Sequence, residues 1–157
     1  MFIRNLANLA IIMVVLTTAF PAFAVDGIIT KQSEHSVDST IEKFEVAAKK
    51  RGFIVFAHLD HADAAASAGL KMPRSTVIVF GDPLLGTPIF IKTPTVAIDL
   101  PLKALVWEDS TGKVFLSYNS AEFVLGPVYA RHGIQVPNDA REQLENTLAS
   151  IADETVQ

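Results

Sequence analysis

The stretch Thr76–Thr87, T-V-I-V-F-G-D-P-L-L-G-T, decides the fold. Its first five residues are β-branched or aromatic and carry no charge, which predicts a fully buried strand inside a sheet. Gly81, Asp82 and Pro83 then end the strand, because proline has no N–H for a strand ladder and fixes its own φ angle. We expect the rest of the chain to pack around this strand and a tight, rigid turn to follow it.

Four further stretches carry strand patterns. Runs of aliphatic, β-branched and aromatic residues predict strands at residues 27–31, 53–59, 102–108 and 114–118. Gly112 lies in the polar stretch between the last two strands, which predicts a β-hairpin with a loop of about five residues. The first two strands flank a predicted helix and form a β-α-β element with it.

Helix patterns fill most of the remaining chain. Apolar residues recur at helical spacing from residue 37 to 48, which predicts a helix that is capped by Ser36 or Asp38 and ends at Gly52. Shorter helices are predicted at residues 62–68 and 120–125, and a final helix begins at residues 137–139.

Prolines and chain ends limit these helices. Four prolines between residues 83 and 101 exclude a long regular helix there and leave room for a short one at residues 88–93. Gly126-Pro127 interrupts the helix that follows residue 120, and we expect the tail at residues 153–157 to fray. The element order therefore favours an α+β fold, a two-layer sandwich with a mostly antiparallel sheet and helices on one face. The other sheet face is left for a partner, a ligand or solvent.

The N-terminal sequence has the pattern of an export signal. Arg4 precedes the apolar run Leu9–Phe20, and Ala22-Phe23-Ala24 is a small-x-small cleavage site. Residues 1–24 are therefore predicted to be a signal peptide, with an uncleaved anchor as the alternative, and residues 25–157 a single domain. We expect the mature protein in the bacterial periplasm, with no membrane segment after cleavage.

Composition excludes several classes of function. The chain has 157 residues, a formal net charge of −4 and no cysteine. Disulfides, thiolate catalysis and zinc–thiolate sites are therefore impossible. The acidic balance also argues against a nucleic-acid partner, which would need a basic face.

The segment H-L-D-H-A-D holds His58, Asp60, His61 and Asp63. Imidazoles and carboxylates could together bind a transition metal, although the spacing differs from that of a helical H-E-x-x-H site. Asp60 or Asp63 could instead cap the helix that follows. The chain has no nucleophile elbow, no P-loop and no dinucleotide fingerprint, so no catalytic constellation assembles.

Other polar and aromatic residues have two interpretations each. Trp107 and Tyr118 could line a ligand pocket or pack within the sheet. Arg131-His132 could bind an anion or satisfy the last carbonyls of a helix. Asp82 and Asp99 could contact a ligand at a strand end, but aspartate in a proline-rich turn is also a common turn former.

Several motifs together resemble the Domain of Unknown Function 302 family over most of the mature chain. They are Gly52-Phe53, Asp60-His61-Ala62, Phe80-Gly81-Asp82-Pro83, Gly86-Thr87, Asp99-Leu100-Pro101-Leu102-Lys103, Val106-Trp107-Glu108-Asp109, Gly112, Tyr118-Asn119 and Arg131-His132. The resemblance implies a TATA-binding-protein-like two-layer sandwich, often found as a dimer, and implies no activity or cofactor. The family usually has asparagine at the position of Asp82.

Seven polar or aromatic residues in these motifs are not required by folding alone, and they form our candidate ligand-binding site: Asp60, His61, Asp99, Trp107, Tyr118, Arg131 and His132. The leading hypothesis is an exported domain without catalytic activity that binds a small molecule or a protein partner and forms a homodimer. The alternative is a metal-dependent or hydrolytic enzyme that uses Asp60, His61 and His132. Two histidines more than roughly 10 Å apart could not share one metal ion, given ligand bonds near 2 Å.

Overall fold

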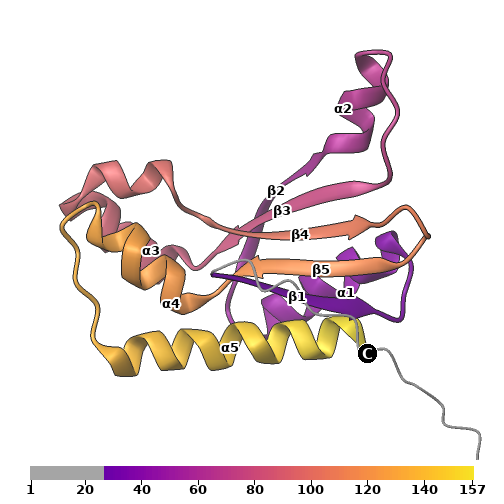
Figure 1. The fold of residues 1–157 in the computed structure, drawn as a ribbon. Helices are drawn as coiled ribbons and strands as arrows, with labels where there is room; N and C mark the ends of the chain where they lie inside the picture. Colours follow the sequence, from indigo (N-terminus) through magenta and orange to yellow (C-terminus); the bar gives the residue numbers. More distant parts are fainter. Residues whose placement is uncertain (1–26) are drawn as a thin grey trace, which may run out of the picture.

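The structure, a computed structural model, describes residues 27–157, so the predicted signal peptide lies outside the described residues. Five strands form one sheet in the order β1-β5-β4-β3-β2, and every neighbouring pair is antiparallel (Figure 1). The strands are β1 Ile28–Ser33, β2 Ile54–Asp60, β3 Ser75–Gly81, β4 Leu102–Glu108 and β5 Val114–Asn119. The predicted α+β fold and the β4–β5 hairpin are confirmed.

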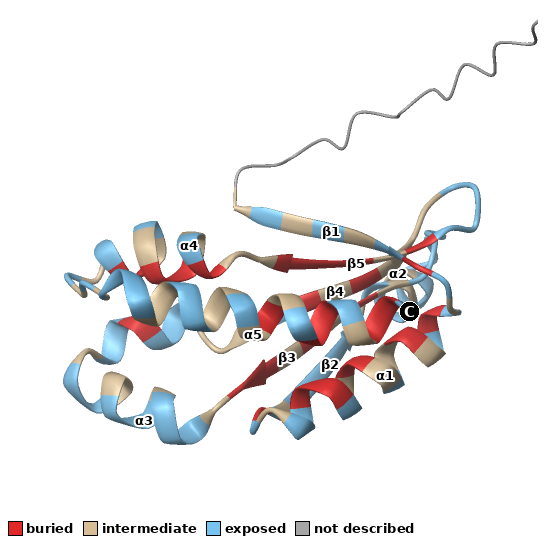
Figure 2. Cartoon of the chain, turned by 90° about the horizontal axis from the view of Figure 1, so that it is seen from below, coloured by how far each residue is buried: buried red, intermediate tan, exposed pale blue. Residues whose placement is uncertain are grey.

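Two long helices cover one face of the sheet (Figure 2). They are α1 Val37–Lys50 and α5 Asn138–Val156. The core between the layers contains Phe44 of α1, Phe80 of β3 and Ile151 of α5, all at most 2% exposed. The rings of Phe44 and Phe80 meet edge to face at 5.0 Å, a favourable arrangement for two aromatic quadrupoles.

No helix among residues 27–157 lies over the opposite face of the sheet. Burial along β3 alternates, so Thr76, Ile78 and Phe80 are buried while Val77 and Val79 are only half-buried. The prediction of a fully buried strand was therefore wrong, because only one face of β3 is covered. The β-α-β prediction also needs correction, since β1 and β2 are the two edge strands and do not pair.

The proline-rich segment contains more helix than predicted. Helix α3 spans Pro83–Lys92 and is followed by the 3-10 helix η1, Pro94–Ile98. Asp82 caps α3 by accepting from the Leu84 N–H at 2.8 Å, and Pro83 occupies the first turn, where no N–H is needed. Pro88 has no N–H to donate to the carbonyl oxygen of Leu84, so the helix loses one backbone hydrogen bond there. Leu84 is 85% exposed, so water can hydrogen-bond this carbonyl instead.

The C-terminal third also differs from expectation. Helix α4, Ala121–Phe123, runs without a break into the π-helical turn η2, Val124–Val128, so Gly126-Pro127 widens the helix instead of interrupting it. The tail does not fray, because Thr155 and Val156 are buried and the Glu34 N–H donates to the Val156 carbonyl at 3.0 Å. Within residues 27–157, no helix is both long and apolar enough to cross a membrane.

The remaining helix, α2 His61–Ser67, stands apart from the two layers. With the connection at residues 68–74 it forms an arm beyond the ends of β2 and β3, on the side of the sheet away from α5 (Figure 1). None of the α2 residues is buried.

Candidate functional site

Asp99, in the connection from η1 to β4, is bound by Arg131 and His132, which directly follow the helical residues 121–130. Arg131 donates from Nε to Oδ2 of Asp99 at 2.8 Å and from Nη2 to Oδ1. His132 Nε2 lies 2.6 Å from the same Oδ2, and its Nδ1 lies 3.0 Å from the Thr95 hydroxyl. A carboxylate only accepts, so Nε2 carries the proton and the Thr95 hydroxyl fixes the ring orientation.

This cluster is partly shielded from water. The side chain of His132 is 8% exposed and that of Asp99 is 21% exposed. The hydrogen bond from His132, followed by that from Arg131, holds the pKa of Asp99 below its usual value. Arg131 and His132 therefore bind a carboxylate of their own chain. These contacts link the segment before β4 to the residues that follow helical residues 121–130.

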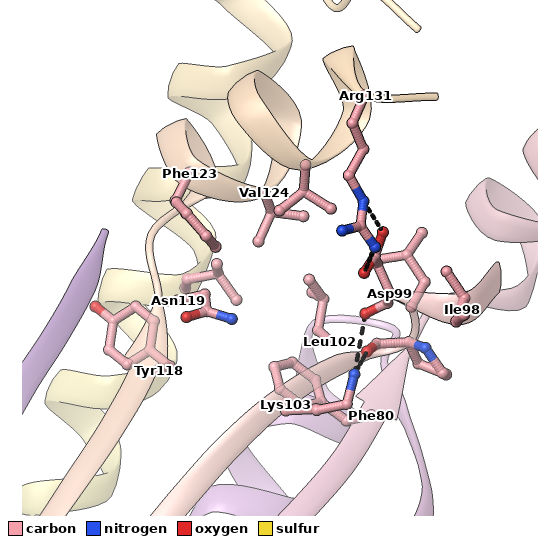
Figure 3. Close-up of a pocket in the computed structure, with 14 residues that line it drawn as sticks. Phe80, Ile98, Asp99, Leu102, Lys103, Tyr118, Asn119, Phe123, Val124 and Arg131 are labelled. Atoms are coloured by element: carbon pink, nitrogen blue, oxygen red, sulfur yellow. Dashed lines mark hydrogen bonds and ion pairs between the residues drawn. The ribbon is translucent and has the colours of Figure 1, made fainter. Parts of the chain in front are cut away.

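A cavity of about 320 Å³ opens beside this cluster. It lies between the segment Ile98–Lys103, the end of β5 and the helical stretch Phe123–Arg131. Figure 3 shows Arg131, Asn119 and Lys103 around one open space, with the amide nitrogen of Asn119 directed into it. Phe80, Leu102, Val124 and Leu148 supply apolar walls.

Tyr118 lines the cavity with its ring, but its hydroxyl lies on the side of the ring away from Arg131 and Asp99 (Figure 3). This hydroxyl is buried and has no hydrogen-bond partner among the described residues. Burial, with smaller contributions from Glu145 and Asp153, raises the pKa of Tyr118 to about 12. The phenol is therefore neutral at physiological pH.

Trp107 lies elsewhere, on the uncovered face of the sheet. Its ring stacks on Phe115 with centroids 4.7 Å apart, and its Nε1 donates to the Ser117 hydroxyl at 2.9 Å. Ser117 also hydrogen-bonds Thr30 at 2.8 Å. These contacts within the sheet account for the position of the Trp107 indole, and the residue is half-buried.

Asp60 and His61 lie at the base of the arm. Asp60 caps α2 by accepting from the Asp63 N–H at 3.0 Å, and His58 pairs with Glu45 of α1 at 2.9 Å. His61 is exposed. Within the described part of the chain, no group of three or more His, Asp or Glu side chains is placed to hold a metal ion.

The register separates His61 from His132. Asp60 pairs with Thr76, whereas Asp99 precedes Leu102, the partner of Phe80. Thr76 and Phe80 are four residues apart on β3, which is roughly 13 Å along a strand. The geometry therefore offers no common centre for the three residues of the enzyme alternative.

Four of the seven candidate residues thus converge: Asp99, Tyr118 and Arg131 line the cavity, and His132 binds Asp99. Sequence reasoning did not single out Lys103, Asn119 or Thr95 as site residues. Lys103 and Asn119 do occur in the family motifs, next to selected residues, and that adjacency was the available signal. Thr95 gave no signal beyond its place in a proline-rich segment.

Together these features define a class of protein: a two-layer α+β sandwich with one uncovered sheet face and a cavity at one end of the sheet. Residues 29–151 match the family described as "Domain of unknown function DUF302", and the chain belongs to this family. A crystal structure of an uncharacterised conserved DUF302 protein from Bacillus stearothermophilus has a similar fold, with a TM-score of 0.68 and 18% identity, covering 82% of this chain and 98% of that one. The predicted family resemblance is confirmed.

Curated relatives include longer proteins. The chain is 39% identical over 113 residues to "Fluoride-specific ion channel FluC 1" of Brucella suis, which covers 72% of this chain and 43% of that protein. The protein of the same name from Brucella abortus gives the same identity and covers 40% of its length. The chain thus spans about two fifths of the curated relatives it matches.

Proposed function

We propose that this protein is an exported protein-interaction domain without catalytic activity that forms a symmetric homodimer through its uncovered sheet face. The observation that carries the proposal is the apolar character of that face. We call it the open face; its apolar residues are Ile54, Phe56 and Leu59 of β2, Val77 and Val79 of β3, Leu105 and Trp107 of β4, and Phe115 of β5.

The open face exposes more large apolar side chains than is usual for a surface that contacts only water. Ile54, Phe56 and Leu59 are 46%, 49% and 52% exposed. Phe56 is the extra residue of a bulge in β2, and its ring lies over Gly81 on the same face. Contiguous apolar patches of this kind mark interaction surfaces in soluble proteins.

The arm supports a second copy as the occupant. Helix α2 has only 7 residues, none of them buried, and isolated helices shorter than about 12 residues are marginal in water. Leu70 and Met72 in the adjoining connection are 66% and 44% exposed. In a two-fold symmetric pair, each arm would pack along the open face of the other protomer and bury these side chains.

The open face and the arm together offer enough surface for a stable dimer interface. Five strands spaced about 4.8 Å apart, each about 20 Å long, give a flat area of roughly 500 Å². A standard interface buries about 800 Å² on each partner, so the face alone falls short and the arm must contribute.

Sedimentation equilibrium on the exported protein tests this proposal. We expect a dimer at micromolar concentration, and a monomer after Leu59→Asp, because the new carboxylate would be desolvated in the interface. Val46→Asp is the matched control, since Val46 is 55% exposed but lies on α1, on the other side of the molecule. Trp107, the single tryptophan, adds a fluorescence signal from the open face itself.

A monomeric parent protein would contradict the proposal, and so would equal effects of the two aspartate substitutions. Loss of the dimer in Leu59→Asp alone, with unchanged thermal stability of the monomer, is the supporting result.

Export to the periplasm is part of the same proposal. It rests on the sequence of residues 1–24 and places the first mature residue at Val25. Intact mass measurement on protein released from the periplasm should give a chain of residues 25–157. A chain that retains Met1 and stays with the membrane would contradict it.

The Brucella relatives favour a second candidate function, an accessory role beside fluoride channels. The matched region makes up two fifths of proteins that are named fluoride-specific ion channels, which supports a functional association in the present organism as well. Deletion of the gene should then increase growth inhibition by sodium fluoride but not by sodium chloride. Equal inhibition of deleted and parent strains would exclude this role.

A further inference from the structure

The geometry points to a second binding site at the end of the sheet, bordering the open face at Lys103: the cavity beside Asp99, which we propose binds a small carboxylate with an apolar body. Its volume of about 320 Å³ lies at the lower end of the range typical of ligand sites, about 300–1,000 Å³. An occupant of this size would be a single small molecule.

The inner wall determines the apolar part of the ligand. Phe80, Leu148 and Val124 line the cavity and are only 1%, 3% and 4% exposed, so the apolar surface that leaves water when a ligand binds there is mainly the ligand's own. An aliphatic or aromatic group placed against these side chains gains free energy in proportion to the area it buries.

Three donors at the mouth determine the polar part. Lys103 uses two of its three N–H groups on the carbonyl oxygens of Asp99 and Pro101, at 2.9 and 3.1 Å, and keeps one. Arg131 binds Asp99 through Nε and Nη2, which leaves Nη1 free, and Figure 3 shows this nitrogen on the cavity side of the guanidinium. The amide of Asn119 adds a neutral donor.

The net charge of the residues that line the cavity favours an anionic ligand. Asp99, Lys103 and Arg131 are the charged residues that line the cavity, and they leave one positive charge in excess. The carboxylate of Asp99 is already bound by Arg131 and His132, so it is a weak competitor for the remaining donors. A carboxylate at the mouth would complete the pairing of Lys103 and Arg131.

Three probes of nearly equal size test the proposal by isothermal titration calorimetry on the exported protein: phenylacetate, 2-phenylethanol and 2-phenylethylamine. We expect phenylacetate to bind at least about tenfold more tightly than the other two, since hydrogen bonds to charged groups are the stronger ones. Equal binding of all three, or no binding of phenylacetate at millimolar concentration, would overturn the proposal.

Variants locate the site. Lys103→Gln should weaken phenylacetate binding about tenfold, Lys103→Arg should preserve it, and Asn119→Asp should abolish it by placing a second carboxylate at the mouth. Lys113→Gln, on the exposed β4–β5 loop, is the matched control and should bind as the parent does. If Lys103→Gln melts at the parental temperature and binds phenylacetate with parental affinity, the assignment of the site is wrong.

Discussion

Replacing Tyr118 by phenylalanine should stabilise the protein. Tyr118 is 5% exposed, and its hydroxyl is one of two buried side-chain polar atoms without a partner in residues 27–157, the other being Nε2 of His35. The folded state therefore gives up the hydration of this hydroxyl and gains no hydrogen bond in return. Phenylalanine keeps the ring and its packing while it removes that penalty.

The magnitude follows from the cost of an unpaired buried group, about 1–3 kcal/mol. For a domain of this size, each kcal/mol shifts the melting temperature by roughly 3–5 °C. We therefore expect Tyr118→Phe to melt at least about 3 °C above the parent, and to unfold at higher urea concentration with an unchanged m-value. Both values can be measured by circular dichroism at pH 7.

High pH gives an independent check on the same residue. Burial, with Glu145 and Asp153 adding to it, raises the pKa of Tyr118 to about 12 in the folded protein, above the value near 10 of an unfolded chain. The folded state thus holds this proton more tightly, so the corresponding stability is fully present below pH 10 and is lost as the pH rises through 12. The advantage of Tyr118→Phe over the parent should widen between pH 10 and 12.

Tyr129→Phe is the control, because Tyr129 is 6% exposed but its hydroxyl is not among the buried atoms that lack a partner. It should change the free energy of unfolding by no more than about 0.5 kcal/mol. A loss of 1 kcal/mol or more in Tyr118→Phe would refute the reasoning, since it would mean that the hydroxyl has a partner in solution.

Three further predictions concern stability. His132, followed by Arg131, lowers the pKa of Asp99, so the stability that this carboxylate contributes is present above pH 4 and is lost as the pH falls through the lowered pKa. The Asp99→Asn variant should therefore melt at a lower temperature than the parent at pH 7. This difference in melting temperature should shrink in acid. Gly27 has φ +78°, and a Cβ there would lie 2.7 Å from a neighbouring ring, so Gly27→Ala should cost more than about 1 kcal/mol in urea unfolding. Phe44→Ala should cost about 3–5 kcal/mol in the same measurement, through the cavity it leaves in the core.

The parts of the fold that were predictable depend on local patterns. Helix α1 and the β4–β5 hairpin follow from apolar spacing, a serine cap and a glycine in the loop, all contained within short windows of sequence. The sequence predicts only a short helix that begins at Pro88, with Pro83 ending the strand before it. The observed helix α3 begins at Pro83, because a proline in the first turn is compatible with a helix. The ordered end of α5 depends on β1, more than 100 residues away, and no local pattern encodes that contact.

The candidate site shows the same division. The motifs marked Asp99 and Arg131-His132, but their pairing spans more than 30 residues and depends on where α4 and η2 place the chain. Asp60 and Trp107 stood out equally in the sequence, yet local roles account for them: a helix cap for the first, a stacked ring on the sheet for the second. The residue types show which side chains need a hydrogen-bond or packing partner. Which residue becomes that partner depends on how the fold brings distant parts of the chain together.

The two proposed surfaces meet at Lys103, and this shared residue couples them. Lys103 pairs with Val79 in the sheet, so its side chain leaves β4 on the open face, while its ammonium group lies at the cavity mouth. Dimerisation through the open face would take this cation out of water, at a cost that a bound carboxylate offsets. Phenylacetate should therefore tighten the dimer, and by linkage the dimer should bind phenylacetate more tightly by the same factor. Sedimentation equilibrium with and without phenylacetate measures this factor, and Lys103→Gln should reduce it to one. A dimer that dissociates when phenylacetate binds would mean that Lys103 is more exposed in the dimer than in the monomer, opposite to the geometry proposed for the interface.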